Sequence, residues 1–275
     1  LSRHWFSTKL AKFLEPIAIK KASLITGVAE GYYKGVIDRN PRLLKRCVFG
    51  AMPYGGEVED HKAVDGMNKS PSLFPATADK VRLVYAGAML PKAYKPLEVV
   101  FRAIKNNPAL FTDVEFHFIG TGKTPDDENG FNIKPLAEKY RLWQTIVYEY
   151  PKRIPYLEVL VHLHVASGIF ILGSTEPHYT PSKVYQGVLS GKPILAVLHK
   201  ESSAAKVIGN SGAGLVLSFT EQNLDIIESG FPKIFNQYLA MLPAYDVSKI
   251  NMEAFENYSA KNVTKKLAEL LNTIV

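Results

Sequence analysis

The sequence predicts an α/β protein: a Rossmann-like parallel sheet with helices on both of its faces. From Lys80 onward, short apolar runs alternate with helical patterns, which is typical of repeated strand–helix units. The runs are apolar at consecutive positions, as in strands that are buried on both faces of a parallel sheet. The clearest unit, residues 169–197, reads IFILGSTEPHYTPSKVYQGVLSGKPILAV and predicts a strand, a polar loop, a short helix and a second strand.

Composition limits the class of protein. Of the 275 residues, 47% are hydrophobic and 21% are charged, as in globular proteins, and no run of about 18 apolar residues predicts a membrane span. The start, LSRHWFSTKLAKF, lacks the apolar segment and cleavage site of a signal peptide and has no initiator methionine, so we expect a fragment or a processed chain. The lone Cys47 excludes an internal disulfide and a cysteine-based zinc site and fits a reducing, cytoplasmic compartment.

The net charge of +7 belongs to one end of the chain. Residues 1–46 contain ten Lys or Arg and three acidic residues, while the remaining 23 basic and 23 acidic residues cancel. Such a segment favours attraction to an anionic surface, which would place the protein peripherally at the inner membrane face, or to a phosphate-linked acceptor. The alternative is an ordinary solvated helix face. We expect no nucleic-acid partner, because no aromatic residues interleave the basic ones.

The elements expected before Lys80 are short. Residues 7–21 predict a helix that Pro16 should kink or interrupt, with one apolar face formed by Leu10, Phe13, Leu14 and Ile17. Strands are expected at residues 23–27 and 47–50, with a helix at 30–38 between them. Residues 53–78 are rich in Gly, Pro, Ser and Asp, which predicts a connection between domains.

After Lys80 the predicted elements alternate regularly. Strands are expected at residues 81–85, 114–119, 145–148, 169–172, 194–197 and 214–217. Helices are expected from Pro96 and near residues 134–140, 155–165, 181–191, 202–208 and 221–228. A last helix, residues 259–275, carries a clean apolar stripe, and we expect it to pack across the domain boundary.

The loop before the helix at 181–191 is the strongest candidate for ligand binding. Pro181 suits a first helical turn and Gly191 suits its end. That first turn should present free N–H groups and the positive end of the helix dipole beside Ser182 and Lys183, which together favour a bound phosphate. The alternative is an ordinary crossover with a solvated lysine.

Three other loops follow predicted strands at the edge of the sheet where ligands bind. After the first strand, Gly87 permits close backbone approach, and Lys92 and Lys95 can reach a pyrophosphate. After the second come Gly120 and a GxGK sequence that is neither a Walker loop nor a full dinucleotide fingerprint, so a flexible turn is an equal alternative. After the third, residues 148–153 can border a nucleobase or form an exposed loop.

Other chemistry is weakly indicated. His178 is conceivable as a catalytic base, although a histidine in a phosphate loop more often donates a hydrogen bond. His162 and His164 lie two residues apart in a predicted helix and so do not face one metal ion. We expect no metal and no cofactor, and there is no GxSxG elbow.

Taken together, these loops resemble the C-terminal, donor-binding domain of a GT-B fold glycosyltransferase, family-4-like. The matching text is LVYAGAMLPKAYKPLEVVFRAI, FHFIGTGK, RIPYLEVLVHLHVASGIFILGSTEPHYTPSKVYQGVLSGKPILAV and GNSGAGLVLSF. The resemblance covers residues 80–275, and residues 1–50 resemble the end of the acceptor-side Rossmann domain. It implies a remnant at 1–50, a linker at 51–79, a donor domain at 80–245 and a boundary-crossing helical segment at 246–275.

The resemblance implies metal-independent transfer of a sugar from a UDP- or GDP-linked donor to an acceptor. The acceptor is unknown, and a membrane-associated acceptor is one of the options. It places Ser182 and Lys183 at the diphosphate, assisted by Lys92 or Lys95, with Arg153 beside the base and Gln186 facing the ribose. The implied nucleotide-sugar site comprises Gly87, Lys92, Lys95, Gly120, Arg153, Thr180, Ser182, Lys183 and Gln186. Lys183 and Glu176 are the catalytic candidates. The chain alone is expected to lack turnover, because the acceptor domain usually supplies the catalytic base.

Two departures keep alternatives open. The family usually has two glutamates seven residues apart, but Gln186 stands at the second position, Glu176 is not at the expected spacing, and Ala88 replaces a common arginine. A neutral amide binds a hydroxyl less strongly than a carboxylate does. The chain can therefore also be a degenerate nucleotide-sugar-binding or interaction module, or belong to a GT-B epimerase. A nicotinamide dehydrogenase is disfavoured because no GxGxxG follows a strand.

Overall fold

The computed structural model describes residues 3–67, 69–77 and 79–274. The chain forms two compact units. The first contains the residues up to Tyr54 together with those from Lys261 onward, and the second runs from Gly55 to Ala260. Within the described ranges, no helix has both the length and the apolar character needed to cross a membrane.

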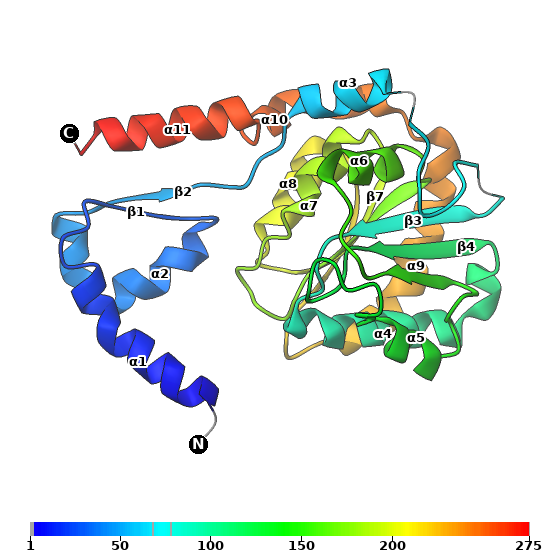
Figure 1. Cartoon of the computed structure of the whole chain (residues 1–275), viewed down its shortest axis with the longest axis horizontal. Coiled ribbons are helices and arrows are strands. Elements are labelled where there is room, and N and C mark those ends of the chain that lie inside the picture. Colours follow the sequence, from blue (N-terminus) through cyan, green and yellow to red (C-terminus); the bar gives the residue numbers. More distant parts are fainter. Residues whose placement is uncertain (1–2, 68, 78, 275) are drawn as a thin grey trace. The chain divides into compact units, whose positions relative to one another are not determined.

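The first unit is a small α/β layer (Figure 1). Two parallel strands, β1 (Leu24–Gly27) and β2 (Val48–Ala51), pair residue for residue, and both lie within one residue of the strands expected from the sequence. Its helices are α1 (Arg3–Ala18), α2 (Glu30–Arg39) and most of α11 (Ala260–Asn272). Leu270 of α11 packs closely over Gly50 of β2, and a Cβ at residue 50 would require that side chain to move.

Helix α1 keeps an apolar face that this unit does not bury. The helix continues through Pro16 to Ala18, held to α2 by Glu15, which accepts a hydrogen bond of 2.9 Å from Arg39 Nε. The arginine holds the pKa of that carboxyl below its ordinary value. Yet the predicted apolar face is exposed, with accessible fractions between 44% and 71% for Leu10, Phe13, Leu14 and Ile17.

The second unit contains the predicted parallel sheet. Its six strands lie in the order β5-β4-β3-β6-β7-β8, and every neighbouring pair is parallel. The chain builds outward from β3 in one direction, then returns to the middle and builds outward from β6 in the other. Ligands of such sheets bind where the order reverses, here between the carboxyl ends of β3 and β6. The strands are β3 (Val81–Ala86), β4 (Val114–Ile119), β5 (Val147–Tyr150), β6 (Gly168–Leu172), β7 (Ile194–His199) and β8 (Gly214–Phe219).

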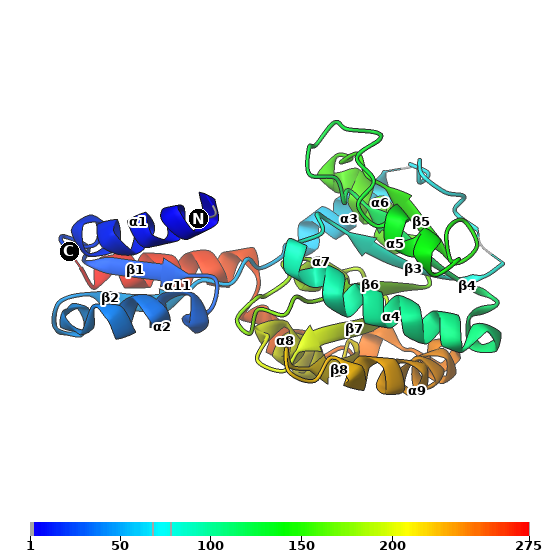
Figure 2. The ribbon, with the colours of Figure 1, turned by 90° about the horizontal axis from the view of Figure 1, so that it is seen from below.

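Alternate residues of the strands enter two separate cores, which explains why the strands are apolar throughout. On one face, residues such as Tyr85, Phe118 and Phe170 pack against α4 (Tyr94–Asn106), α5 (Lys134–Lys139) and α9 (Asp225–Met241). On the other, residues such as Val84 and Ile171 pack against α6, α7 and α8. Figures 1 and 2 show the two helical layers on opposite sides of the sheet. The second layer comprises α6 (Tyr156–His164), α7 (Lys183–Leu189), α8 (Ser203–Ser211) and the short α10 (Met252–Glu256).

The packing of α9 depends on a glycine at the start of β6. Tyr238 of α9 is fully buried and donates a hydrogen bond of 2.9 Å to the carbonyl of Pro193. Its hydroxyl lies where a Cβ of residue 168 would be. Gly168 is therefore required by close approach of the tyrosine.

Beyond α1, other regions of the chain also depart from the prediction. Strand β5 lies two residues later than expected, because residues 141 and 144 adopt positive φ in a tight turn that delays it. Helix α9 continues to Met241 although Pro232 lies inside it, since burial of Phe231 and Phe235 outweighs the local breaker. Helix α3 (Val58–Gly66) lies in the segment expected to be a connection; its weak amphipathic pattern hides it.

Candidate functional site

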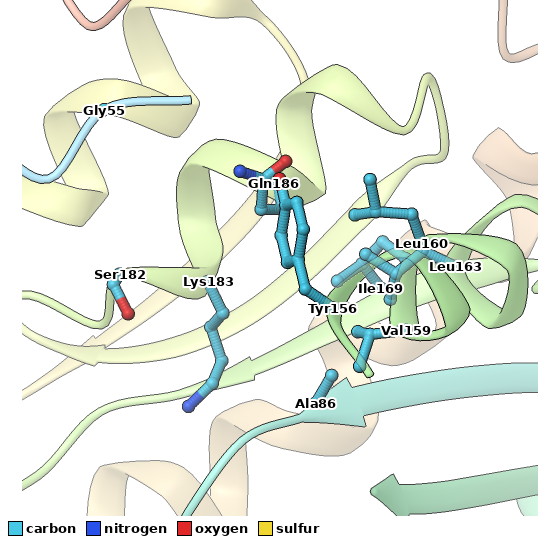
Figure 3. Close-up of a pocket in the computed structure, with 10 residues that line it drawn as sticks. All are labelled: Gly55, Ala86, Tyr156, Val159, Leu160, Leu163, Ile169, Ser182, Lys183 and Gln186. Carbon is cyan, nitrogen blue, oxygen red and sulfur yellow. The ribbon is translucent and has the colours of Figure 1, made fainter. Parts of the chain in front are cut away.

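A pocket of about 270 Å³ opens at the reversal point of the sheet (Figure 3). One side is apolar and formed by α6, including Leu160 and Leu163, together with Ala86 at the end of β3 and Ile169 near the start of β6. The polar side comes from the segment that leads into α7. There the pocket is lined by Ser182, Lys183 and Gln186, three residues that the sequence assigned to the nucleotide-sugar site.

The ammonium of Lys183 lies over the ring of Tyr85, the penultimate residue of β3. Its Nζ is 4.0 Å from the ring centroid and donates a hydrogen bond of 2.8 Å to the tyrosine hydroxyl, which itself donates to the carbonyl of Ala88. A cation over an aromatic face gains electrostatic stabilisation. Gly87 completes the arrangement: its φ is +131°, and a Cβ there would lie 3.2 Å from Lys183 Cε. Glycine thus provides both the turn after β3 and the space for the lysine.

Burial lowers the pKa of Lys183 to about 7. No carboxylate is among the causes of that shift, so desolvation of the ammonium acts without a compensating charge. An anion that entered the pocket would supply the missing charge and raise the pKa again. Such a lysine is a common feature of functional sites.

The first turn of α7 is less open than expected. The helix begins at Lys183 rather than at Pro181 and has only seven residues. The amides of Val184 and Tyr185 already donate to the carbonyls of Pro181 and Ser182, at 3.1 and 3.3 Å. The expectation of a fully free first turn is therefore wrong, since a tight turn occupies these two donors. The side chain of Ser182 is exposed and does not cap the helix.

Gln186 is held by a residue of helix α3. Its Oε1 lies 2.8 Å from Nε2 of the buried His61, and an ideal Cβ on Gly56 would lie 3.5 Å from its Nε2. The oxygen of the amide is therefore occupied by protein, and the nitrogen lies toward the segment that includes Gly55, another residue of the pocket wall.

The remaining residues of the loop after β6 make contacts within the protein. Glu176 pairs with Lys92 at 3.1 Å, which joins the loop after β6 to the loop after β3. The hydroxyl of Thr180 is buried and lies 2.5 Å from that of Ser203 in α8. None of these three predicted site residues lines the 270 Å³ pocket, and neither does Lys95, which is exposed on α4.

The loops after β4 and β5 contact each other. Gly120, with φ +69°, donates to the carbonyl of Tyr150 at 2.8 Å, and its open side faces Arg153. Arg153 is exposed, and its amide donates to Pro125. These two predicted residues lie next to each other but outside the pocket. The tyrosine rings of β5 do not form a free platform, because they stack beside His117 at centroid distances of 4.8 and 5.9 Å.

A buried carboxylate fixes the long loop that follows β4. Glu149 of β5 accepts hydrogen bonds from the amides of Asn132, Ile133 and Lys134 at 2.8–3.0 Å, and from the hydroxyl of Thr121. It thereby caps the start of α5. The sequence placed Glu149 in a loop that borders a base; its side chain instead serves the protein's own backbone.

His162 has a structural role, whereas His178, the conceivable catalytic base, lies on the surface. His162 of α6 accepts hydrogen bonds from the amides of Ser72 and Leu73, and His178 is exposed in the loop after β6. Over residues 3–67, 69–77 and 79–274, no group of three His, Cys, Asp or Glu side chains has a metal-binding arrangement.

Two residues that contact the polar side chains of the pocket were not predicted from the sequence. Tyr85 was assigned to a strand, and nothing in its pattern shows that its hydroxyl meets Lys183 from a segment about one hundred residues away. His61 lies in the helix that was taken for a connection. The available signal in the sequence was a single histidine, His61, shortly after the glycine pair Gly55 and Gly56.

No protein-family model matches the sequence, and no curated protein matches it either. Solved structures do match over nearly its whole length. A UDP-forming α,α-trehalose-phosphate synthase from Burkholderia xenovorans aligns with 98% of this chain at 16% identity and a TM-score of 0.70. HepE from Anabaena, solved in complex with UDP-glucose, aligns with 99% of this chain at 15% identity and a TM-score of 0.68. Sucrose-phosphate synthase from Thermosynechococcus elongatus aligns with 97% of this chain at 14% identity and a TM-score of 0.65.

The chain is shorter than these proteins. It spans 64% of the length of the trehalose-phosphate synthase, 70% of HepE and 62% of the sucrose-phosphate synthase. At such identities the similarity shows the fold.

Proposed function

From the GT-B glycosyltransferase fold that this chain has, as its sequence predicted, we propose that the pocket beside Lys183 binds the diphosphate of a nucleotide-sugar donor. The protein of which this chain is a part or the whole would transfer the donor's sugar to an acceptor. UDP is the first nucleotide to test, because the similar structures include a UDP-forming synthase and a complex with UDP-glucose.

One observation carries the proposal: Lys183, whose ammonium has no carboxylate partner in the described part of the chain, is among the residues that line a pocket at the reversal point of a doubly wound sheet. The diphosphate leaving group gains negative charge as the bond to the sugar breaks. A lysine fixed on Tyr85 would stabilise that charge from its starting position, without rearrangement. This is the task that a divalent metal performs in other enzymes, so we propose transfer without a metal.

The other assignments follow the family resemblance. Ser182 would donate to the diphosphate beside Lys183, and Gln186 would face the ribose. Arg153 would border the base. Lys92 already pairs with Glu176, so it would assist only after that ion pair opens. We retain a cytoplasmic location and a membrane-borne acceptor as proposals, because the ten basic residues among residues 1–46 would be attracted to an anionic surface.

Thermal unfolding of the full chain tests donor binding. UDP at 100 times its dissociation constant would stabilise the fold by about 2.7 kcal/mol, which is about 5–10 °C for a domain of this size. Lys183→Met should abolish most of the shift, while the control Lys192→Met, which removes a lysine outside this pocket, should not. EDTA should leave the shift unchanged. Absence of any shift with UDP and with GDP would overturn the proposal.

The second candidate is a binding module without turnover, and Gln186 favours it because its amide is already engaged by His61. The two candidates differ in what a carboxylate at this position would do. If the full-length protein hydrolyses or transfers the donor, and Gln186→Glu increases the rate, the enzyme is supported. Nucleotide binding with no turnover in either form would support the module, and release of UDP without an acceptor product would point to the epimerase.

A further inference from the structure

Behind Gln186 a chain of hydrogen bonds leads from the pocket to the surface. His61 Nδ1 lies 2.9 Å from His164 Nε2, and His164 Nδ1 lies 3.0 Å from Asp65 Oδ1. The two rings are nearly parallel, at 20°. Together with the contact between His61 and Gln186, this gives three consecutive hydrogen bonds, which we call the histidine relay: Gln186, His61, His164 and Asp65.

The number of protons on the rings of His61 and His164 determines which end of the Gln186 side-chain amide can face His61. A carboxylate only accepts, so His164 Nδ1 must carry a proton. If His164 Nε2 donates to His61 Nδ1, then His61 carries its single proton on Nε2 and donates it to the Gln186 oxygen, and the two rings share three protons and one positive charge. If the rings are neutral, His61 Nδ1 donates to His164 and His61 Nε2 becomes an acceptor. Only the amide nitrogen of Gln186 can then face it.

We propose that His61 is a positioning residue, and that one proton shared with His164 decides which end of the Gln186 amide faces the pocket. With the proton present, the relay takes the amide oxygen, and the pocket receives an N–H donor. Without it, the amide turns and the pocket receives a carbonyl acceptor. The structure has the first orientation, in which Oε1 faces His61. This inference depends on the proposed function only in placing a donor's hydroxyl beside Gln186.

The charges around His61 oppose one another. On its own helix, Asp60 and Asp65 favour the protonated ring, and from α6 a protonated His164 disfavours it. From α7, Lys183 lines the same pocket as Gln186. Burial is the largest influence and lowers the pKa of His61, so the charged relay depends on Asp65 at its far end.

NMR of the full chain without ligand tests the relay directly. Labelled ring nitrogens of His61 and His164 should show three bound protons at low pH and two at high pH, and the side-chain amide signal of Gln186 should shift with the same midpoint. Asp65→Asn should lower that midpoint by about half to one pH unit. Glu59→Gln, the same change at an exposed site on α3, should leave it in place. An amide signal of Gln186 that does not follow the titration of the rings would overturn the proposal.

A binding measurement tests the consequence for the pocket. At low pH the chain should prefer UDP over 2′,3′-dideoxy-UDP about fivefold, as one hydrogen bond predicts. His61→Phe, or His61→Asn if the first variant does not fold, should remove this preference and leave the affinity for inorganic pyrophosphate unchanged. A preference retained in the variant would refute the role of His61. If the unmodified chain binds no UDP, the proposed function fails, while the NMR result still decides whether the relay exists.

Discussion

Replacing Lys183 by methionine should remove most of the pH dependence of UDP binding. In the empty site, burial holds the pKa of the lysine at about 7, so the ammonium is largely neutral above pH 8. A bound diphosphate would raise that pKa toward its ordinary value. Binding above pH 7 therefore requires uptake of a proton, and the affinity should fall as the pH rises.

The magnitude follows from linkage. The affinity should decrease about tenfold for each pH unit between the pKa of the free site and that of the complex, because one pKa unit corresponds to about 1.4 kcal/mol. At pH 7 the methionine variant should bind UDP about 10–100 times more weakly, since a hydrogen bond to a charged group contributes about 1.5–3 kcal/mol.

Isothermal titration of UDP between pH 7.5 and 9.5, above the last titration of its phosphate, measures this effect. Two buffers with different ionisation heats would report the proton taken up. Lys192→Met is the matched control, because burial also lowers the pKa of Lys192 but that residue does not line the pocket. An unchanged slope in Lys183→Met, or a control that loses the slope equally, would show that Lys183 is not the group involved.

Three further results are expected. Lys183→Met should raise the free energy of unfolding by on the order of 2–4 kcal/mol at pH 7 and below, because the folded protein no longer buries a charged lysine. Between pH 7 and 10.5 the unfolded wild-type chain binds more protons than the folded one, so wild-type stability rises with pH across that window. The difference between the urea midpoints of the wild type and the variant should therefore vanish near pH 10.5. Gly87→Ala should destabilise the fold by about 1–3 kcal/mol and weaken UDP binding, because the added Cβ contacts Lys183 at positive φ, whereas Gly66→Ala, at an open site, should change neither. Glu149→Gln should lower stability by about 2–4 kcal/mol in urea titration, because an amide NH2 would face backbone donors that now meet a carboxylate; a loss below 1 kcal/mol would contradict the anchoring role of Glu149.

The parallel sheet could be predicted because its signal is local. Consecutive apolar residues between turn residues indicate strands buried on both faces, and all six strands were found. The loop before α7 was found for the same reason, since Pro181 and Gly191 lie within one short segment. The boundaries were less predictable: β5 is displaced by a turn at positive φ, and α9 passes Pro232 because long-range burial of Phe235 holds it.

The lining of the candidate pocket could be predicted only in part. Ser182, Lys183 and Gln186 stand close together in the chain and lie in one pocket. Their partners Tyr85 and His61 come from segments about 100 and 125 residues away, so no spacing within the sequence indicates them. The lowered pKa of Lys183 is equally a product of packing, because a lysine at the start of a helix is usually solvated.

The strand that leads to the candidate pocket has a further property. Because both faces of β6 are apolar, a register shift of one residue would still bury apolar side chains. Hydrophobicity alone therefore cannot determine the register of this strand. Side-chain size determines the register, because only a glycine, Gly168, leaves room for the hydroxyl of Tyr238. A shifted strand would place Ser167 or Ile169 against that hydroxyl. The absence of a side chain at Gly168, at the start of β6, thus fixes the position of the other end of the strand. It thereby also fixes the start of the loop that carries Ser182 and Lys183.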